Sequence, residues 1–399
     1  MGRRCIVASG VLSLLVTGIV GAADSRPRAR DVGVPFDGTP GPLDAITDVA
    51  GVEVGFTTLI AGDGPLVVGK GPVRTGVTAI LPRGKANTEP VFAAFFSQNG
   101  NGEMTGSHWI RESGFLDGPV MITNTHSVGV VRDAVIAWQV QHNVVPKTSS
   151  IGAEWWSMPV VAETYDGYLN DTNGFHVKPE HVFAAIDGAR PGPFAEGNVG
   201  GGTGMVCYEF KGGTGTASRR VEVSSTSYTV GVLVQCNCGL RRQLTVRGVP
   251  VGQEVPVERS ARNEWSESEP QDTGSIIIIV ATDAPLLPTQ LERLARRATM
   301  GLARTGSSSG NYSGDIFLAF STSNVDATAK PVASLRMLSN DVIGPVFEAT
   351  AQATEEAILN AMIGAETMTG ISGHQVAALP PDRLRDLLRK YSRLAPPKR

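Results

Sequence analysis

The stretch Gly274-Ser275-Ile276-Ile277-Ile278-Ile279-Val280-Ala281 joins a glycine-serine bond to an unbroken run of apolar, mostly β-branched residues. The run shows no alternation of polar and apolar side chains, so it predicts a β-strand that is buried on both faces. A Gly-Ser pair before a strand is usually a turn. The same pair also suits self-cleavage, because Gly274 has no side chain to obstruct attack on its carbonyl.

Cleavage of this bond would make Ser275 a new N-terminus. Its freed α-amine would have a pKa of roughly 7.7 to 8.0, close enough to neutral to take a proton from the adjacent hydroxyl or from a bound water. One residue would then supply both nucleophile and base. The preceding segment, residues 251–272, is acidic, contains prolines and lacks apolar periodicity, which predicts an exposed loop or linker ending at the cut.

The overall composition is that of an ordinary globular protein. The chain has 399 residues, of which 41% are hydrophobic and 18% charged, enough for one large domain or two. The net charge is −3, from 35 basic and 38 acidic residues. No global charge attracts polyanions, so nucleic acid is not expected as a partner.

The N-terminal residues have the layout of a secretory signal. Arg3 and Arg4 precede an apolar stretch, residues 5–20, that is followed by small residues. The competing interpretation is a membrane anchor, but the stretch is shorter than the ~20 residues of a spanning helix and contains several polar residues and glycines. We expect cleavage after Ala22 or Ala23. The mature protein would be periplasmic or secreted, without membrane attachment.

Three cysteines would remain in the mature chain, too few to staple a fold of this size. Cys236 and Cys238 lie two apart in a strand-like segment, residues 230–238, and so share one face. Buried thiols are the preferred interpretation for this pair. A metal site would need more ligands at close spacing, and the metal-binding motifs His-Glu-x-x-His and paired Cys-x-x-Cys are absent. Neither a metal nor another cofactor is expected.

Apolar periodicity predicts helices over residues 127–140, 285–304 and 344–363, the last with a narrow face of small side chains. Short apolar runs between glycines predict strands at residues 76–81, 91–96 and 120–123.

Two further motifs are given structural interpretations. Ser308 is the centre of a G-x-S-x-G motif, but a helix precedes it and a strand follows it, the reverse of a nucleophile elbow, so a loop is expected. The glycine run at residues 200–204 lacks the following Lys-Ser/Thr of a phosphate-binding loop and predicts tight turns.

Five polar residues near predicted strand ends are candidate site residues. Ser313 and Asp315 lie two apart at the start of a strand and would share a face, which permits a serine-carboxylate relay as well as a turn serine with a capping aspartate. Glu163 and Tyr165 repeat this spacing, and Asn237 ends the 230–238 segment opposite the cysteine face. A phenol or an amide can donate to an oxyanion, and a carboxylate can pair with an amine.

The sequence resembles the self-processing serine aminopeptidases, the family that includes L-aminopeptidase D-Ala-esterase/amidase and the β-aminopeptidases. The likeness covers most of the chain. Its segments, in family order, are DAITDV (44–49), TNTHSVG (123–129), ETYDG (163–167), GGGTGM (200–205), GVLVQCN (231–237), ATDAPL (281–286) and SGDIFLAF (313–320).

This resemblance implies an α+β fold, a single αββα four-layer sandwich of the N-terminal-nucleophile-hydrolase type. The precursor would divide into residues 24–274 and residues 275–399, which share one core, with the strand at 276–281 central. The resemblance further implies a homo-oligomer, for which we expect a tetramer.

The resemblance also implies roles for the candidate residues. Ser275 would attack an amide or ester carbonyl of a small substrate with a free N-terminal amine, and Ser313 and Asp315 would assist it. By the resemblance, some family members carry Glu where Asp315 stands, and the shorter Asp315 side chain moves the carboxylate by about one carbon-carbon bond.

By the same resemblance, Asn237 and Tyr165 would stabilise the oxyanion, and Glu163 would hold the ammonium group of the substrate. The cysteines on either side of Asn237 depart from the family motif.

Two other functions remain open at this stage. One is a non-catalytic periplasmic binding protein on the same fold, and the other is a Ser-His-Asp esterase. The second lacks a nucleophile in strand-turn-helix context, and His126 is expected to be a packed or hydrogen-bonded residue. The sequence does not choose between α-amino, β-amino and D-amino acyl substrates.

Overall fold

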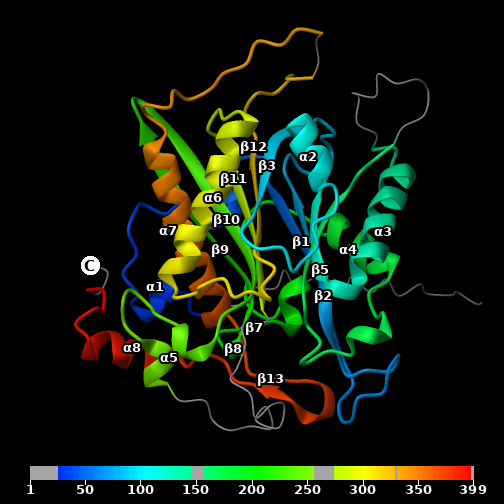
Figure 1. Cartoon of the computed structure of the whole chain (residues 1–399). Coiled ribbons are helices and arrows are strands. Elements are labelled where there is room, and N and C mark those ends of the chain that lie inside the picture. The colour runs from blue at the N-terminus through cyan, green and yellow to red at the C-terminus, as the bar shows by residue number, and fades with distance from the viewer. Residues whose placement is uncertain (1–25, 145–155, 256–273, 329–330, 397–399) are drawn as a thin grey trace, which may run out of the picture.

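The computed structural model describes residues 26–144, 156–255, 274–328 and 331–396, which are organised around two β-sheets (Figure 1). The expected signal sequence, residues 1–23, its cleavage position and residues 256–272 of the expected linker lie outside this part of the chain. The linker's beginning is the short helix α5 (Val251–Glu254), so the expectation of a loop is wrong there. Its first side chain, that of Val251, is fully buried, so the beginning of the segment is not exposed either.

The larger sheet has six strands in the order β4 (Phe115–Leu116), β3 (Val91–Ser97), β12 (Ile316–Ser321), β11 (Ser275–Thr282), β10 (Thr226–Asn237) and β9 (Gly213–Val223). The apolar run after Ser275 forms β11, an interior strand that is buried along its whole length. It pairs antiparallel to β10 and parallel to β12. The prediction of a central buried strand is confirmed.

The smaller sheet has four strands in the order β1 (Glu53–Ala61), β2 (Val73–Leu81), β5 (Val120–Asn124) and β6 (Val160–Thr164). Two short ribbons flank the sheets: β7 (Val206–Cys207) with β8 (Phe210–Lys211), and β13 (Met368–Thr369) with β14 (Gln375–Val376).

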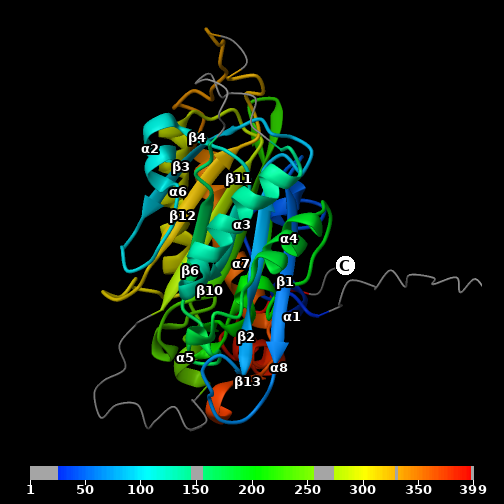
Figure 2. The same cartoon turned by 90° about the vertical axis from the view of Figure 1, so that its right-hand side faces the viewer.

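Helices cover the outer face of each sheet, which gives the four layers αββα. On the six-stranded sheet lie α6 (Pro288–Arg304) and α7 (Gly344–Ile363), and on the four-stranded sheet lie α3 (Val128–Gln141) and α4 (Pro179–Asp187). The layers follow one another from left to right in Figure 1, and Figure 2 views them from the α3 and α4 side. A separate apolar cluster fills the space between the sheets, where β11 contributes Ile277 and Ile279. The predicted α+β sandwich is confirmed.

The remaining helices are short. They are α1 (Ala29–Val32), α2 (Ser107–Ser113) and α8 (Pro381–Lys390), with 3-10 turns η1 (Ile46–Asp48), η2 (Thr125–Ser127), η3 (Thr172–Gly174), η4 (Gly200–Gly204), η5 (Arg241–Gln243) and η7 (Ile371–Gly373). No helix in the four described ranges combines the length and apolarity needed to cross a bilayer.

The three predicted long helices are present. The helix expected over residues 285–304 begins three residues later, at Pro288, because Leu287 is extended and its N–H is capped by the side chain of Gln290. The small face of α7 packs closely on the sheet, since a Cβ at Gly215 of β9 would lie 2.1 Å from the carbonyl oxygen of Ala357. The narrow face of small side chains therefore serves close packing, as the sequence predicts.

A cluster of charged side chains fastens the N-terminal segment to α7 and β9. The Glu356 carboxylate is fully buried and lies 2.6 Å from Arg30 and 2.7 Å from Arg219. Arg28 is bound to Glu196 at 2.7 Å. These pairs hold residues 28–30 against the body of the domain, a contact between distant segments that local sequence patterns do not indicate.

Candidate active site

The candidate residues gather where strands of both sheets begin or end. In the six-stranded sheet, Asn237 at the end of β10 pairs with Ser275 at the start of β11, and Asp315 directly precedes β12. In the four-stranded sheet, Glu163 lies near the end of β6, in register with Thr123 of β5. Because β10 runs antiparallel to β11 and β12 runs parallel to it, the last residue of β10 and the first residues of β11 and β12 lie at the same end of the six-stranded sheet.

Ser275 is buried, and its hydroxyl oxygen lies beside the Gly274-Ser275 peptide bond. The N–H of Gly314 donates to Ser275 Oγ at 3.2 Å and to the Gly274 carbonyl oxygen at 3.3 Å. One donor therefore touches both the proposed nucleophile and the carbonyl it would attack. Because Gly314 occupies a lone pair of Oγ, the hydroxyl hydrogen remains available to a base.

Gly274 is packed against the backbone of β10. A Cβ at this position would lie 2.2 Å from the Asn237 carbonyl oxygen and 2.7 Å from Cys238 Cα. Both obstacles are main-chain atoms, so a larger residue would displace the strand end. Glycine is thus required by packing as well as by access to the carbonyl.

Ser313 and Asp315 meet as their spacing predicts. Ser313 Oγ donates to Asp315 Oδ1 at 2.7 Å, and both side chains are fully buried. The N–H of Asp315 donates to Asn99 Oδ1 at 2.7 Å, which fixes the backbone beside the pair. A hydroxyl that donates to a carboxylate can itself accept a proton and pass one on.

Both ends of the Asn237 side chain are held. Its Oδ1 accepts the N–H of Val206 at 2.7 Å, and its Nδ2 donates to the Tyr165 carbonyl oxygen at 3.0 Å. These contacts fix which end of the amide carries the NH₂ group. A carboxamide nitrogen has two hydrogens, so Asn237 can make a second donation.

Glu163 is 4% exposed and is held by two donors, the N–H of Glu103 at 3.0 Å and the hydroxyl of Thr125. Burial raises the pKa of its carboxyl group, against the lowering effect of these hydrogen bonds. A Cβ at Gly102 would lie 3.4 Å from Glu163 Oε1 and 3.2 Å from Gly314 Cα. Gly102 therefore lies between Glu163 and Gly314, the residue whose N–H contacts Ser275. Glu163 is close enough to Ser275 to bind another group of the same substrate.

Tyr165 is 49% exposed, whereas Glu163 is buried. β6 ends at Thr164, so Tyr165 lies just beyond the strand in which alternation is expected. The Tyr165 ring lies over Gly167, where a Cβ would be 2.2 Å from the phenol oxygen. Burial raises the pKa of this phenol, and the neighbouring Asp166 raises it further. Tyr165 remains protonated, and hence a donor, at neutral pH.

The cysteines beside Asn237 differ from the expected pair of thiols. Cys236 forms a disulfide with Cys207, and the buried Cys238 keeps its thiol. The prediction is wrong for Cys236 because the β7-β8 ribbon folds back onto the end of β10. All three sulfur atoms lie within 4.8 Å of one another, but the disulfide occupies two of them.

Three other features that are considered in the sequence as possible functional sites have structural roles. Ser308 is in a loop, as predicted, where its hydroxyl accepts a hydrogen bond from Gln243 at 2.9 Å. The glycine run forms the buried turn η4, in which a Cβ at Gly201 would lie 2.1 Å from Gln235 Oε1. His126 is exposed and stacks on Phe175, with the ring centroids 6.2 Å apart.

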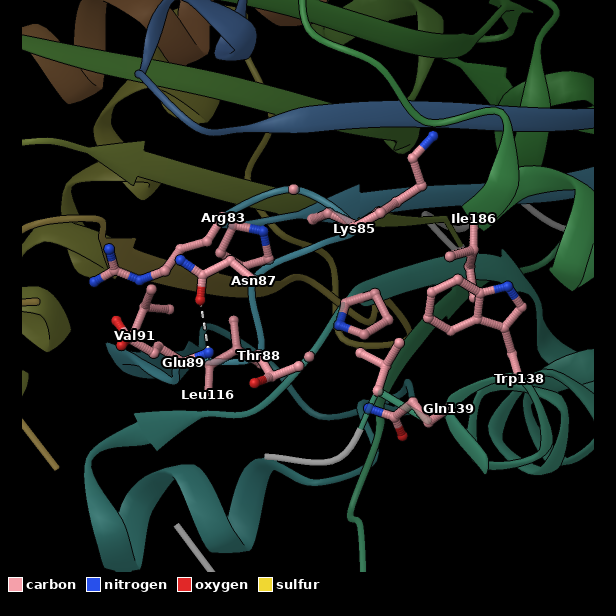
Figure 3. A pocket seen from close by; sticks show the side chains of 16 residues that line it. Arg83, Lys85, Asn87, Thr88, Glu89, Val91, Leu116, Trp138, Gln139 and Ile186 are labelled. Atoms are coloured by element: carbon pink, nitrogen blue, oxygen red, sulfur yellow. Dashed lines mark hydrogen bonds between the residues drawn. The ribbon is translucent and has the colours of Figure 1, made fainter. Parts of the chain in front are cut away.

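A pocket near the start of β5 is distinct from this site (Figure 3). It is lined by residues that include Lys85, Leu116, Trp138 and Gln139, whereas Glu163 pairs near the other end of β5. Its cavity of about 30 Å³ has room for one or two water molecules. It is too small for a peptide substrate.

The model of peptidase family S58 matches residues 44–376. The chain belongs to peptidase family S58. A relative in this family is the beta-peptidyl aminopeptidase BapA of Sphingosinicella microcystinivorans, 56% identical over 388 residues, which are 94% of this chain and 96% of the relative. The BapA of Sphingosinicella xenopeptidilytica is 48% identical over 399 residues, which are 96% of each chain.

Similar solved structures have the same fold. The L-aminopeptidase D-Ala-esterase/amidase of Ochrobactrum anthropi, described as a prototype of the serine aminopeptidases and a variant of the Ntn hydrolase fold, superposes with a TM-score of 0.85. It is 47% identical and covers 93% of this chain and 100% of its own. A Burkholderia sp. beta-aminopeptidase has a TM-score of 0.79 and 46% identity, with coverage of 91% and 99%.

Membership of S58 makes this chain a serine aminopeptidase of the Ntn hydrolase fold. The resemblance seen in the sequence is confirmed. Neither the binding-protein nor the Ser-His-Asp esterase alternative is supported by these relatives.

Sequence reasoning missed several residues that organise the site. Gly314 stands between the predicted pair Ser313 and Asp315, but a backbone N–H leaves no signal in the sequence. Val206, Thr125 and Asn99 reach the site from loops or strand ends far away in the chain. Of these, only Thr125 stands in a segment that carries the family resemblance, residues 123–129.

Proposed function

We propose that this S58 aminopeptidase cleaves itself at Gly274-Ser275 and then hydrolyses amides or esters of small substrates with a free N-terminal amine. The observation that carries the proposal is the N–H of Gly314, which contacts both Ser275 Oγ and the Gly274 carbonyl. The names of the relatives at 56% and 48% identity favour β-aminoacyl substrates within this class.

Self-cleavage begins with attack of Ser275 Oγ on the Gly274 carbonyl carbon. The Oγ–C bond forms, the C–N bond breaks, and the hydroxyl proton is transferred to the departing nitrogen of Ser275. Ser313 and Asp315 carry out this proton transfer in our proposal. The N–H of Gly314 stabilises the negative charge that develops on the Gly274 carbonyl oxygen. Water then hydrolyses the ester, which leaves a carboxylate on Gly274 and a free amine on Ser275.

In the mature enzyme, the Ser275 amine takes the proton of its own hydroxyl as Oγ attacks the substrate carbonyl. The second Nδ2 hydrogen of Asn237 and the phenol of Tyr165 donate to the oxyanion. The proton moves to the leaving amine or alcohol, and water releases the acyl group from Oγ. Ser313 and Asp315 support both proton transfers.

Glu163 binds the ammonium group of the substrate in this proposal. Its carboxylate already accepts two hydrogen bonds, and the two oxygens together have about four acceptor positions. A buried carboxylate that meets an ammonium makes a charge-assisted hydrogen bond.

The role of Glu163 is tested by comparing an aminoacyl amide with its N-acetyl derivative. We expect the N-acetyl compound to be a poor substrate, because acetylation removes the charge that Glu163 binds. Equal kcat/KM values for the two compounds would contradict the assignment and indicate a general amidase.

We further propose that the protein is exported, loses residues 1–22 or 1–23, and assembles as a homotetramer. The signal-like layout of the first residues supports export. Cell fractionation with N-terminal sequencing tests it, since a membrane fraction still carrying Met1 would contradict it. Light scattering of the purified protein measures the oligomer.

A further inference from the structure

Lys211 is a buried lysine beside the site that the mechanism above does not use. It lies in β8, its side chain is fully buried, and burial lowers the pKa of its amine to about 7. Its Nζ donates to the carbonyl oxygens of Met205 and Gly212, each at 2.9 Å, and more weakly to Gly202 at 3.4 Å. Within the part of the chain that the structure describes, it takes part in no ion pair. A buried ammonium without a counter-charge is costly, so a specific function is expected of it.

The Met205-Val206 peptide unit connects this lysine to Asn237. Its carbonyl oxygen accepts from Lys211, and its N–H donates to Asn237 Oδ1 at 2.7 Å. The two hydrogen bonds lie on opposite ends of one planar group. The lysine amine, the peptide and the carboxamide therefore form a continuous chain whose last member is the Nδ2 group of Asn237.

Such a chain acts on the amide electronically and geometrically. Donation from Nζ at one end, strongest when the amine is protonated, polarises each linked group, so the N–H of Val206 and the Nδ2 hydrogens of Asn237 become stronger donors. The effect is larger in a buried site, where the effective dielectric constant is low. The N–H of Val206 also holds Oδ1 away from the developing oxyanion, which would repel it.

We propose that Lys211 is a positioning residue for catalysis, which orients and polarises Asn237 through the Met205-Val206 peptide. This inference rests on the proposed role of Asn237 as an oxyanion donor. Lys211 touches neither substrate nor Ser275 in this account. Its contribution appears only when negative charge develops on the substrate oxygen, so it affects kcat more than KM.

A purely structural function is the competing explanation. The contacts of Lys211 with Gly202 and Gly212 would serve to fix η4 and the start of β9 even if Asn237 were inert. A structural role predicts that removing the ammonium harms every function of the enzyme, with or without Asn237. A role through Asn237 predicts that the effect disappears once Asn237 is replaced.

A double-mutant cycle separates these explanations. Lys211→Met keeps an unbranched side chain that is one atom shorter and removes the amine, and it is combined with Asn237→Ala in processed enzyme. We expect Lys211→Met alone to lower kcat about tenfold with KM changed less than about twofold. In the Asn237→Ala background it should lower kcat by less than about twofold.

The cycle has outcomes that overturn the inference. The same loss of kcat in both backgrounds, or a change in KM alone, would show a structural role. If Asn237→Ala lowers kcat and Lys211→Met does not, the inference about Lys211 fails and the role of Asn237 stands. If Asn237→Ala leaves kcat unchanged, the proposed oxyanion site fails first.

Lys85 provides a control that is matched in its hydrogen-bond partners. Its Nζ also donates to two backbone carbonyls, those of Asp187 and Ala189, each at 2.7 Å, but it lines the pocket of Figure 3. Lys85→Met should leave kcat unchanged. Lys85 is only half-buried, so an equal loss would show that the kinetic effect is a general result of removing an amine that donates to backbone carbonyls.

If Lys211→Met does not fold, the unsubstituted enzyme still tests the inference by NMR. The ¹⁵N resonance of Asn237 Nδ2 should shift over the same pH range in which Lys211 Nζ titrates. An Asn237 resonance that stays constant through the Lys211 titration would overturn the inference.

Discussion

Gly274→Ala is expected to block maturation by distorting the scissile bond. The added Cβ would lie 2.2 Å from the Asn237 carbonyl oxygen and 2.7 Å from Cys238 Cα, well inside van der Waals contact. Because both atoms belong to the backbone of β10, relief requires the start of β11 to move away by roughly 1 Å. A displacement of this size in a reacting group costs about 10²-fold in rate. The strain itself is about 1 to 3 kcal/mol, so the precursor should still fold.

The assay follows the conversion of the precursor to the two cleaved chains over time. The protein is purified soon after expression begins, and its intact mass gives the fraction cleaved at each time. Gly129→Ala in α3 is the control, since its Cβ would meet no atom within 4 Å. It should mature at the normal rate. Normal maturation of Gly274→Ala would refute the argument that backbone packing positions the scissile carbonyl.

Four further predictions concern the site and its surroundings. Asn237→Ala should fold and mature but lose about 10² to 10³ in kcat, as expected for one oxyanion donor; an unchanged kcat would remove it from the site. Replacing Cys207 and Cys236 by alanine should lower the free energy of unfolding by about 3 kcal/mol, measured in urea, because the disulfide closes a loop across 29 positions. The free energy of unfolding should rise with pH between about 7 and 10.5, at up to about 1.4 kcal/mol per pH unit from Lys211, because the unfolded lysine binds a proton that the folded one has lost. Lys211→Met should flatten this rise, and an unaltered slope would contradict the assigned pKa. Glu356→Gln should destabilise the fold by about 1 to 3 kcal/mol, because the buried Arg219 loses its nearest counter-charge while Asp44 remains 3.6 Å away; no change in thermal unfolding would contradict this.

The local sequence predicts a helix or strand where all residues on one face have the same kind of surroundings. Residues 276–281 are apolar at every position because β11 is covered on both faces. The small residues of α7 recur at helical spacing because the helix lies against the glycine-containing β9. The Ser313 and Asp315 contact follows from a spacing of two in extended chain.

The local sequence does not predict contacts that depend on how distant segments meet. Cys207 reaches Cys236 only because the β7-β8 ribbon returns to the end of β10. Tyr165 is half exposed and lies beyond the end of β6, which strand alternation does not predict. The burial of Lys211 depends on three carbonyls from loops around it, and a single lysine in the sequence is normally expected at the surface.

The central claim is that Ser275 becomes an N-terminal nucleophile, and intact mass with N-terminal sequencing of the active protein tests it most directly. We expect two polypeptides, the smaller one beginning Ser275-Ile276-Ile277, and a single uncut chain for Ser275→Ala with no aminopeptidase activity. A wild-type protein that remains one intact chain and has full aminopeptidase activity would contradict the claim.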